Sequence, residues 1–271
     1  MIELGFDFGA MASPCEVRLQ GNDEAQLQRA AAAAIDEVRR IEKKYSRYDE
    51  SSIVSRVNAA AGSGLSIEID DETSALLEFA ARLHDLSEGL FDVTSGVLRR
   101  VWNFRQPRVP AQSEIDALLP LIGWSKVRRD GRRIALPHAG MEIDFGGFGK
   151  EYAADRAAEV LTREGVEHGF VNLGGDIRVV GPRSYGDGWR LGIRHPRRAD
   201  ALIHSVELGS GGLATSGDYE RFFEVDGRRY CHLLDPRSGW PISYWQSVSV
   251  IAPTCAAAGA ACTIAALRQQ D

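Results

Sequence analysis

The chain of 271 residues has a formal net charge of −6, and 44% of its residues are hydrophobic. This composition supports a sizeable core, and the scattered basic residues argue against a nucleic-acid-binding surface. No stretch approaches the ~20 apolar residues of a membrane span. The opening segment MIELGFDFGAMASPC has neither the basic start nor the apolar run of a signal peptide or lipoprotein signal. We therefore expect a cytoplasmic protein and, without a linker-like break, a single domain over residues 1–271.

Apolar spacing predicts the first elements of the chain. A strand-like segment over residues 15–21 comes first. Asp23 then opens a helix that runs to about Tyr45, in which apolar residues recur at helical spacing with charged residues opposite. Asp70 or Asp71 is expected to cap a second helix that ends at Gly89.

The remaining elements change from helices to strands. Ser113 is predicted to cap a short helix with Asp116 in the capping-box position, and Asp130-Gly131 marks a hairpin. A further helix covers roughly residues 152–163. The strands expected after it are GFVNL, DIRVV, WRLGIR, HSVEL, RFFEV, RYCHLL and QSVSVIA, before a final Ala-rich helix. Short-turned strands with clustered helices predict an α+β fold, a mostly antiparallel sheet flanked by helices.

Three glycine-rich segments are predicted to form turns after strands: IDFGGFGKEYAAD, VNLGGDI and GSGGLATSGDYE. The first runs straight into a helix with Lys150 in its first turn, so free backbone N–H groups and the helix dipole would favour a phosphate there. Glycines can also simply permit tight turns. Three such turns, each with an acidic residue, favour a binding site over this simpler explanation.

Several well-known site motifs are absent. The chain has no GxGxxG with a following ribose-binding acid, no GxxxxGK[ST], no GxSxG and no HExxH. Among six histidines, His232 stands out because it precedes the Asp-Pro turn in HLLDPRSG, although a structural role is equally compatible with that position. The four cysteines form no CxxC pair and are expected to be buried thiols.

The order of these motifs resembles one known family. The matching blocks are AMASP, SRYDESSIVSRVN, GLFDVTSG, IDFGGFGKEYAADRAAEVL, FVNLGGDIRVVG, ATSGDYERFFEVDGRRYCHLLDPRSGWPI and SVSVIAPT. In this order they are similar to the successive blocks of the ApbE family, the FAD:protein FMN transferases. The resemblance spans nearly the whole chain and implies the T-fold-like architecture of that family.

The resemblance implies a site for the substrate FAD and for Mg²⁺. The residues that would bind FAD are Met11, Tyr48, Leu90, Phe91, Asp92, Asp144, Lys150, His232 and Leu233. Of these, Met11, Tyr48 and the segment 90–92 would line the flavin, and His232 is also the candidate base. The backbone oxygen of Gly147 and the side chain of Thr263 would be magnesium ligands.

The implied reaction is a phosphoryl transfer. A threonine hydroxyl of a target protein would attack the FMN-side phosphorus of FAD, which leaves FMN esterified to the target and releases AMP. Metal and backbone amides would neutralise the pyrophosphate while a base takes the hydroxyl proton. No motif marks the target protein or the oligomeric state.

Two positions depart from the family pattern. Gly259 stands where the family has an Asp, four residues before the threonine, so magnesium affinity should suffer unless another acid substitutes. Glu151 replaces the usual small residue after the lysine and adds a negative charge. The alternatives are therefore a catalytically weakened FAD-binding member or an FAD pyrophosphatase. Because replacing a glycine within a helix is favourable, we expect the helix to accept Gly259→Asp. The substitution should also raise magnesium affinity.

Overall fold

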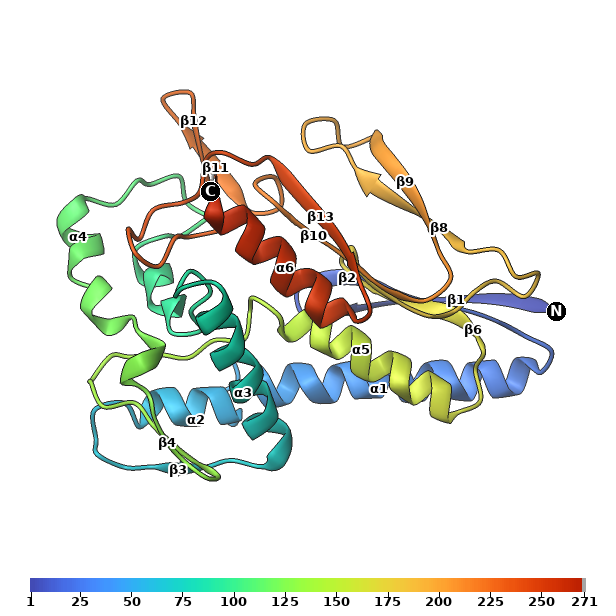
Figure 1. The fold of residues 1–271 in the computed structure, drawn as a ribbon, viewed down its shortest axis with the longest axis horizontal. Helices are drawn as coiled ribbons and strands as arrows, with labels where there is room; N and C mark the ends of the chain where they lie inside the picture. Colours follow the sequence, from blue (N-terminus) through green and yellow to red (C-terminus); the bar gives the residue numbers. More distant parts are fainter. Residues whose placement is uncertain (270–271) are drawn as a thin grey trace. The chain divides into compact units, whose positions relative to one another are not determined.

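The computed structural model describes residues 1–269 (Figure 1). Its elements form two compact units, each of which draws on three separated stretches of the chain. Unit 1 comprises Met1–Lys43, Gly146–Ser216 and Ser247–Cys262, and unit 2 comprises Lys44–Phe145, Gly217–Gln246 and Thr263–Asp271. The single domain over residues 1–271 stays a prediction. No helix in the described part of the chain is both long enough and apolar enough to cross a membrane.

A six-stranded sheet forms the centre of unit 1, with strand order β1-β2-β6-β7-β10-β13. Its strands are β1 (Ile2–Ala10), β2 (Ser13–Gly21), β6 (His168–Leu173), β7 (Asp176–Gly181), β10 (Gly211–Gly217) and β13 (Ser247–Ala252). The neighbours β1 and β2, β2 and β6, β6 and β7, and β7 and β10 run antiparallel. The prediction of an α+β fold with a mainly antiparallel sheet is thus confirmed.

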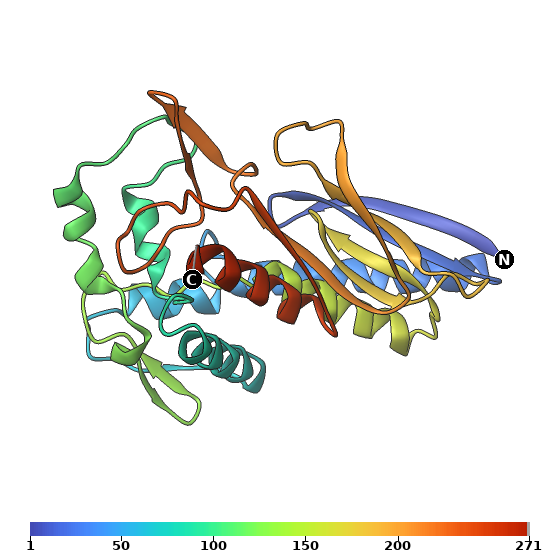
Figure 2. The same cartoon turned by 45° about the horizontal axis from the view of Figure 1, so that its top comes forward.

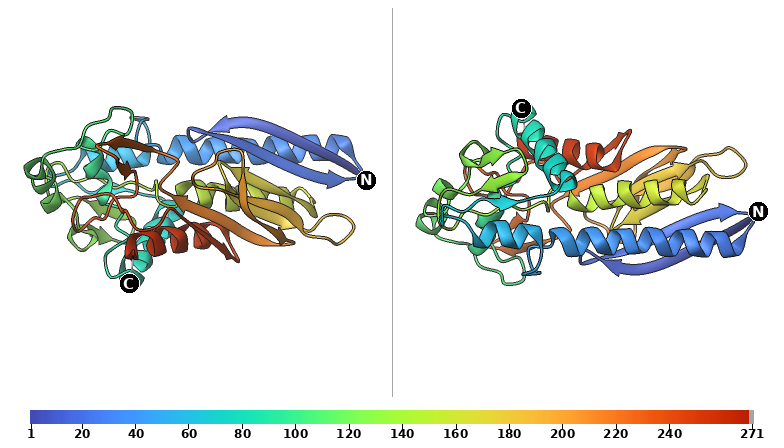
Figure 3. Two further views of the ribbon diagram at one scale, coloured as in Figure 1. Left: turned by 90° about the horizontal axis from the view of Figure 1, so that it is seen from above. Right: turned by 90° about the horizontal axis from the view of Figure 1, so that it is seen from below.

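Helices and a hairpin pack against opposite faces of this sheet. Helices α1 (Glu24–Tyr45) and α5 (Gly149–Arg163) lie side by side (Figure 3), and α6 (Cys255–Arg268) packs on β10. The hairpin β8 (Trp189–Arg194) and β9 (Leu202–Leu208) covers the other face. In β10, Leu213 packs with Trp189 of β8, while the next residue, Ala214, packs with Ala258 of α6. Successive side chains of a strand point to opposite faces, which explains this alternation.

Unit 2 combines helices and 3₁₀ turns with two small sheets. Its helices are α2 (Ile53–Ala59), α3 (Asp71–Leu86) and α4 (Gln112–Asp116), with 3₁₀ turns η1 (Ser95–Arg100), η2 (Leu119–Leu121) and η3 (Trp124–Lys126). Its strands are β3 (Ile67–Glu68), β4 (Arg128–Asp130) and β5 (Arg133–Ala135) in one sheet, and the hairpin β11 (Phe222–Val225) and β12 (Arg228–Cys231) (Figure 2). The buried Trp102 ring stacks on Phe223 and Tyr230 of that hairpin, so the hairpin belongs to this core.

Local capping signals located the starts of two helices, α1 and α3. Asp23 accepts a hydrogen bond from Gln26 N at 3.1 Å, and Asp70 caps α3 through Thr73 N at 2.9 Å. The predicted cap at Ser113 is wrong, because Ala111 occupies the N-cap position of α4. There the Glu114 carboxylate accepts from Ala111 N at 2.8 Å, so the side chain in the third helical position satisfies the helix start without a capping serine.

The third glycine-rich segment is a strand, not a turn. Residues 211–217 form β10, which lies between β7 and β13 in the sheet. A Cβ atom at Gly212 would meet the Cα atom of Cys255 at 2.5 Å. Glycine is thus required there for the close approach of the α6 start, a need that depends on tertiary packing and that the sequence pattern did not reveal.

Candidate functional site

An ion pair lies where two of the predicted glycine turns meet in unit 1. Lys150, in the first turn of α5, places Nζ 2.7 Å from Oδ2 of Asp176, which begins β7 after the turn at Gly174 and Gly175. Thr215 of β10 donates its backbone N–H to the same carboxylate at 3.4 Å. Burial raises the pKa of Asp176, and Lys150 opposes that shift. The structure therefore brings all three glycine-rich segments to one charged spot.

Glu151 lies next to this pair and is a functional candidate whose role the sequence left open. Its side chain is buried at 8% exposure, and its Oε2 atom has no hydrogen-bond partner within residues 1–269. Burial, reinforced by the nearby Asp176, raises the pKa of Glu151 to about 8. Carboxyl groups that are buried without a full set of partners are uncommon outside functional sites.

The Glu151 side chain faces Gly259 of α6. A Cβ atom at Gly259 would meet Glu151 Oε1, and would lie 2.6 Å from Cγ and 2.8 Å from Cδ. An aspartate at this position would therefore force the Glu151 side chain to shift, which argues against the expectation that α6 accepts it without cost. The sequence offered both positions as departures from the family pattern, but nothing in it placed them in contact.

Asp155 holds the start of α6 against α5. Its carboxylate accepts hydrogen bonds from the backbone N–H groups of Cys255 at 2.8 Å and Ala256 at 2.9 Å. Arg178 Nε lies 3.2 Å from the same carboxylate. These contacts set the position of Gly259, and Thr263 follows one helical turn later on the same face of α6.

Met11 lies in the tight turn that joins β1 to β2. Both turn residues have left-handed backbone conformations, with φ of 52° at Met11 and 56° at Ala12. The backbone N–H of Met11 donates to Glu42 Oε1 at 2.5 Å, which holds the turn. Such conformations cost free energy in residues other than glycine and recur at ligand sites, which agrees with a binding role for Met11.

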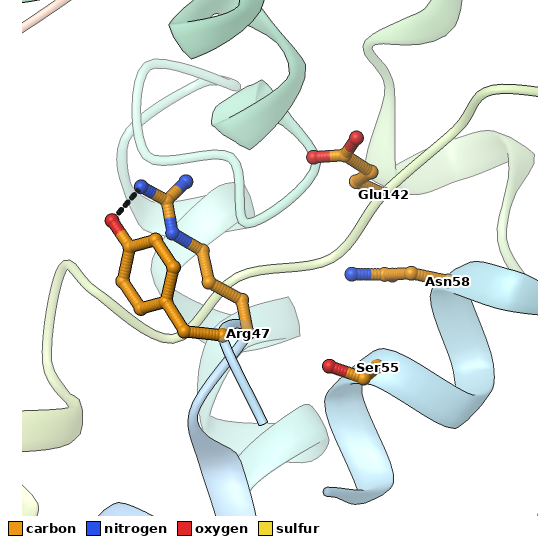
Figure 4. A pocket seen from close by; sticks show the side chains of 5 residues that line it. Arg47, Ser55, Asn58 and Glu142 are labelled. Atoms are coloured by element: carbon orange, nitrogen blue, oxygen red, sulfur yellow. Dashed lines mark hydrogen bonds between the residues drawn. The ribbon is translucent and has the colours of Figure 1, made fainter. Parts of the chain in front are cut away.

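Tyr48 lines a pocket within unit 2 (Figure 4). The other lining residues are Arg47, Ser55, Asn58 and Glu142, and the cavity measures about 350 Å³. Tyr48 is 81% exposed, and the Arg47 guanidinium lies 4.6 Å from the centre of its ring. Asn58 exchanges two hydrogen bonds with the backbone of Ile143, at 3.0 and 2.7 Å, which fixes the pocket wall. An exposed aromatic ring beside a cation is suited to stacking against a planar ligand.

Asp144 pairs with two arginines that the sequence analysis did not single out. Arg99 donates to its carboxylate, and Arg47 Nη1 lies 3.8 Å from Oδ2. The N-cap residue of α5 is Phe148, so Asp144 does not occupy the capping position of that helix. Arg47 could have been noticed as the neighbour of Tyr48, whereas no local pattern marks Arg99.

The segment from Leu90 to Asp92 is buried in unit 2. The exposed fractions are 6% for Leu90, 4% for Phe91 and 8% for Asp92. Two hydrogen bonds from Thr94 and one from Trp124 N, at 2.6 to 2.9 Å, end on the Asp92 carboxylate. That carboxylate thus holds the turn in shape, and the contact of this segment with a flavin stays a prediction.

His232 and Leu233 follow directly after β12 in unit 2. His232 donates its backbone N–H to Arg221 O at 3.0 Å, and Leu233 O accepts from Ile242 N at 2.9 Å. The Asp-Pro turn that follows is closed by the buried Asp235, whose carboxylate accepts from Arg237 N at 2.8 Å. The backbone around the candidate base is therefore well anchored.

The candidate residues form two groups, one in each unit. Unit 1 contains Met11, Gly147 and Lys150. Unit 2 contains Tyr48, Leu90, Phe91, Asp92, Asp144, His232, Leu233 and Thr263. Among the residues that the structure describes, no three His, Cys, Asp or Glu side chains gather as a ready metal-binding cluster. The assigned roles of all these residues remain predictions.

Comparison with known proteins identifies the family. The model of the ApbE family matches residues 11–271. FAD:protein FMN transferase of Klebsiella pneumoniae is 33% identical over 247 residues, which cover 89% of this chain and 75% of that protein. The FAD:protein FMN transferase of Treponema pallidum is 33% identical over 272 residues, which cover 92% of this chain and 74% of that protein. The chain belongs to the ApbE family, as the order of its motifs indicated.

Solved structures agree with this assignment. The crystal structure of the ApbE protein from Thermotoga maritima is 34% identical, with a TM-score of 0.92, and the match covers 100% of this chain and 88% of that one. The apo form of the flavinyl transferase ApbE from Pseudomonas stutzeri is 31% identical with a TM-score of 0.84, covering 97% and 84%. The architecture expected from the resemblance is thus confirmed.

Proposed function

We propose that this protein transfers FMN from FAD to a threonine hydroxyl of a target protein, with Mg²⁺, and releases AMP. The observation that carries the proposal is likeness along nearly the whole chain to proteins named FAD:protein FMN transferase, at 33% identity in two of them. The chain is accordingly a transferase that uses FAD as its substrate. The threonine acceptor, the metal and the AMP product are the finer parts of the proposal.

Unit 1 offers a helix N-terminus for the pyrophosphate of FAD. Lys150 stands in the first turn of α5, where the N-terminal end of the helix dipole favours an anion. Its ion pair with Asp176 holds the ammonium group in place. Lys150 would therefore orient the phosphates rather than take part in proton transfer.

Unit 2 offers groups for the flavin and for the dinucleotide. Tyr48 and Arg47 would lie against the flavin ring in the pocket that they line. Asp144 would accept hydrogen bonds from N–H or O–H groups of FAD, with its carboxylate oriented by Arg99 and Arg47. Side chains held by such partners lose less entropy when the ligand binds.

Oxygen donors are available for Mg²⁺, which prefers them and usually retains several waters and substrate phosphates. The Gly147 backbone oxygen and the Thr263 hydroxyl would hold the ion, and the unpartnered Oε2 of Glu151 is a buried oxygen that suits a cation. When bound, magnesium neutralises charge on the pyrophosphate. His232 would accept the proton of the attacking threonine hydroxyl, a task that imidazole suits near neutral pH.

To test the proposal, the purified protein is incubated with FAD and MgCl₂. A cell extract from the organism that makes the protein supplies the acceptor proteins. Transfer predicts AMP in solution and protein bands that keep flavin fluorescence after denaturing electrophoresis. AMP with free FMN and no fluorescent band would identify a pyrophosphatase instead. FAD binding without AMP would identify a weakened binding protein, and the absence of FAD binding would overturn the proposal.

A further inference from the structure

Glu151 and Gly259 form a matched pair on two neighbouring helices of unit 1. The carboxyl carbon of Glu151 lies 2.8 Å from the point where residue 259 would carry its Cβ atom, and Oε1 lies closer still. The carboxyl carbon of an aspartate is bonded directly to Cβ. Glu151, projecting from α5, thus places its carboxyl group in the region that an aspartate on α6 would reach.

The acidic side chains around Glu151 each form an ion pair with a basic side chain. Asp155 is paired with Arg178 and two backbone N–H groups. Asp176 is paired with Lys150. No basic side chain within residues 1–269 makes a salt bridge with Glu151, and its Oε2 is both buried and unpartnered. An ionised carboxylate in such a place is costly unless a cation joins it.

Thr263, a magnesium ligand by the proposed function, belongs to the same helix as Gly259. Residue 263 lies four positions after residue 259, about 6 Å further along α6 and on the same face. A carboxylate at the position of residue 259 and a hydroxyl one turn later are hard oxygen ligands of the kind that magnesium and manganese bind.

We propose that the Glu151 carboxylate is the acidic protein ligand of the divalent cation in this protein, and that it takes from α5 the place of an acidic side chain on α6. The inference rests on the proposed function for the presence of the cation. It reverses the expectation that Gly259 weakens the metal site, because the glycine leaves room for a carboxylate from the neighbouring helix.

The experiment measures Mn²⁺ binding in the presence of FAD, with free Mn²⁺ counted by electron paramagnetic resonance and FAD alone as the background. Glu151→Gln keeps the size of the side chain and removes its charge. It should weaken Mn²⁺ binding at least ~10–100-fold. Mutation of a residue that only hydrogen-bonds to a metal ligand already causes a loss of that size. Glu159→Gln, an exposed substitution on the same helix, is the matched control and should leave Mn²⁺ affinity unchanged.

Exchange of the two residues gives a second, independent test. Gly259→Asp alone should lower Tm, because two carboxyl groups would compete for one space. The double variant Glu151→Gly with Gly259→Asp should recover both Tm and Mn²⁺ affinity. Without metal, Glu151→Gln should melt no earlier than the unmodified protein, and added Mn²⁺ should raise its Tm less.

The results separate this inference from the proposed function. FAD affinity is followed in every variant by tryptophan fluorescence. If FAD binds and Glu151→Gln holds Mn²⁺ as tightly as the unmodified protein, the inference is overturned while flavin transfer stands. If the unmodified protein binds no FAD, the proposed function fails, and a Glu151-dependent Mn²⁺ site would then belong to another activity.

Discussion

The Asp155→Ala substitution is expected to loosen the start of helix α6 and to destabilise unit 1. The Asp155 carboxylate accepts from the backbone N–H groups of Cys255 and Ala256 and lies 3.2 Å from Arg178 Nε. Alanine would leave two helix-terminal N–H groups and one guanidinium without this acceptor. The effect should extend to Gly259 and Thr263, because α6 carries both.

The size of the loss follows from the contacts. A hydrogen bond to a charged group contributes about 1.5–3 kcal/mol, and Asp155 accepts two from the backbone. Burial raises the pKa of Asp155, so desolvation of the carboxylate opposes this gain. We therefore expect Asp155→Ala to lower the free energy of unfolding by about 2–4 kcal/mol, below the sum of the bonds. Asp155→Asn, which keeps one acceptor, should cost less.

Urea unfolding followed by circular dichroism measures this difference. The matched control is Asp36→Ala on α1, where the side chain is 76% exposed and lies 3.5 Å from Arg39. An exposed pair of this kind contributes roughly 0.2–1 kcal/mol. If Asp155→Ala costs no more than this control, the Asp155 contacts do not stabilise α6 and the reasoning is refuted.

Three further predictions concern the site and the thiols. Asp144→Ala should weaken FAD binding by about 1.5–3 kcal/mol, measured by tryptophan fluorescence, and unchanged affinity with a lower Tm would make Asp144 purely structural. His232→Ala should slow AMP release on the order of 10²–10⁴-fold at unaltered FAD affinity, and equal turnover would exclude it as the base. Burial raises the pKa of Cys231 to about 11 and of Cys262 to about 12, so thiolate is scarce at pH 8 and a thiol reagent should react only after denaturation. Rapid labelling of the native protein would contradict this.

Local patterns in the sequence determined much of the framework. Apolar spacing and capping residues located α1 and α3, and the Asp-Gly pair marked the hairpin of β4 and β5. These signals depend on only a few neighbouring residues, so they can be recognised without knowledge of the rest of the chain. The order of the glycine-rich blocks also indicated the family, and the α+β class followed from the succession of strands.

The tertiary structure alone decided which residues meet. In the sequence, strand β10 looked like a glycine turn. Its glycines are needed because α6 packs closely against the strand, not because the chain bends there. The pairing of Asp144 with Arg99 joins segments that no periodicity links. In the same way, the sequence showed Gly259 as a lost carboxylate and Glu151 as an unexplained charge, and only the packing of α6 on α5 brought them into one place. Contacts between distant segments depend on the packing of whole elements, and no local propensity encodes that packing.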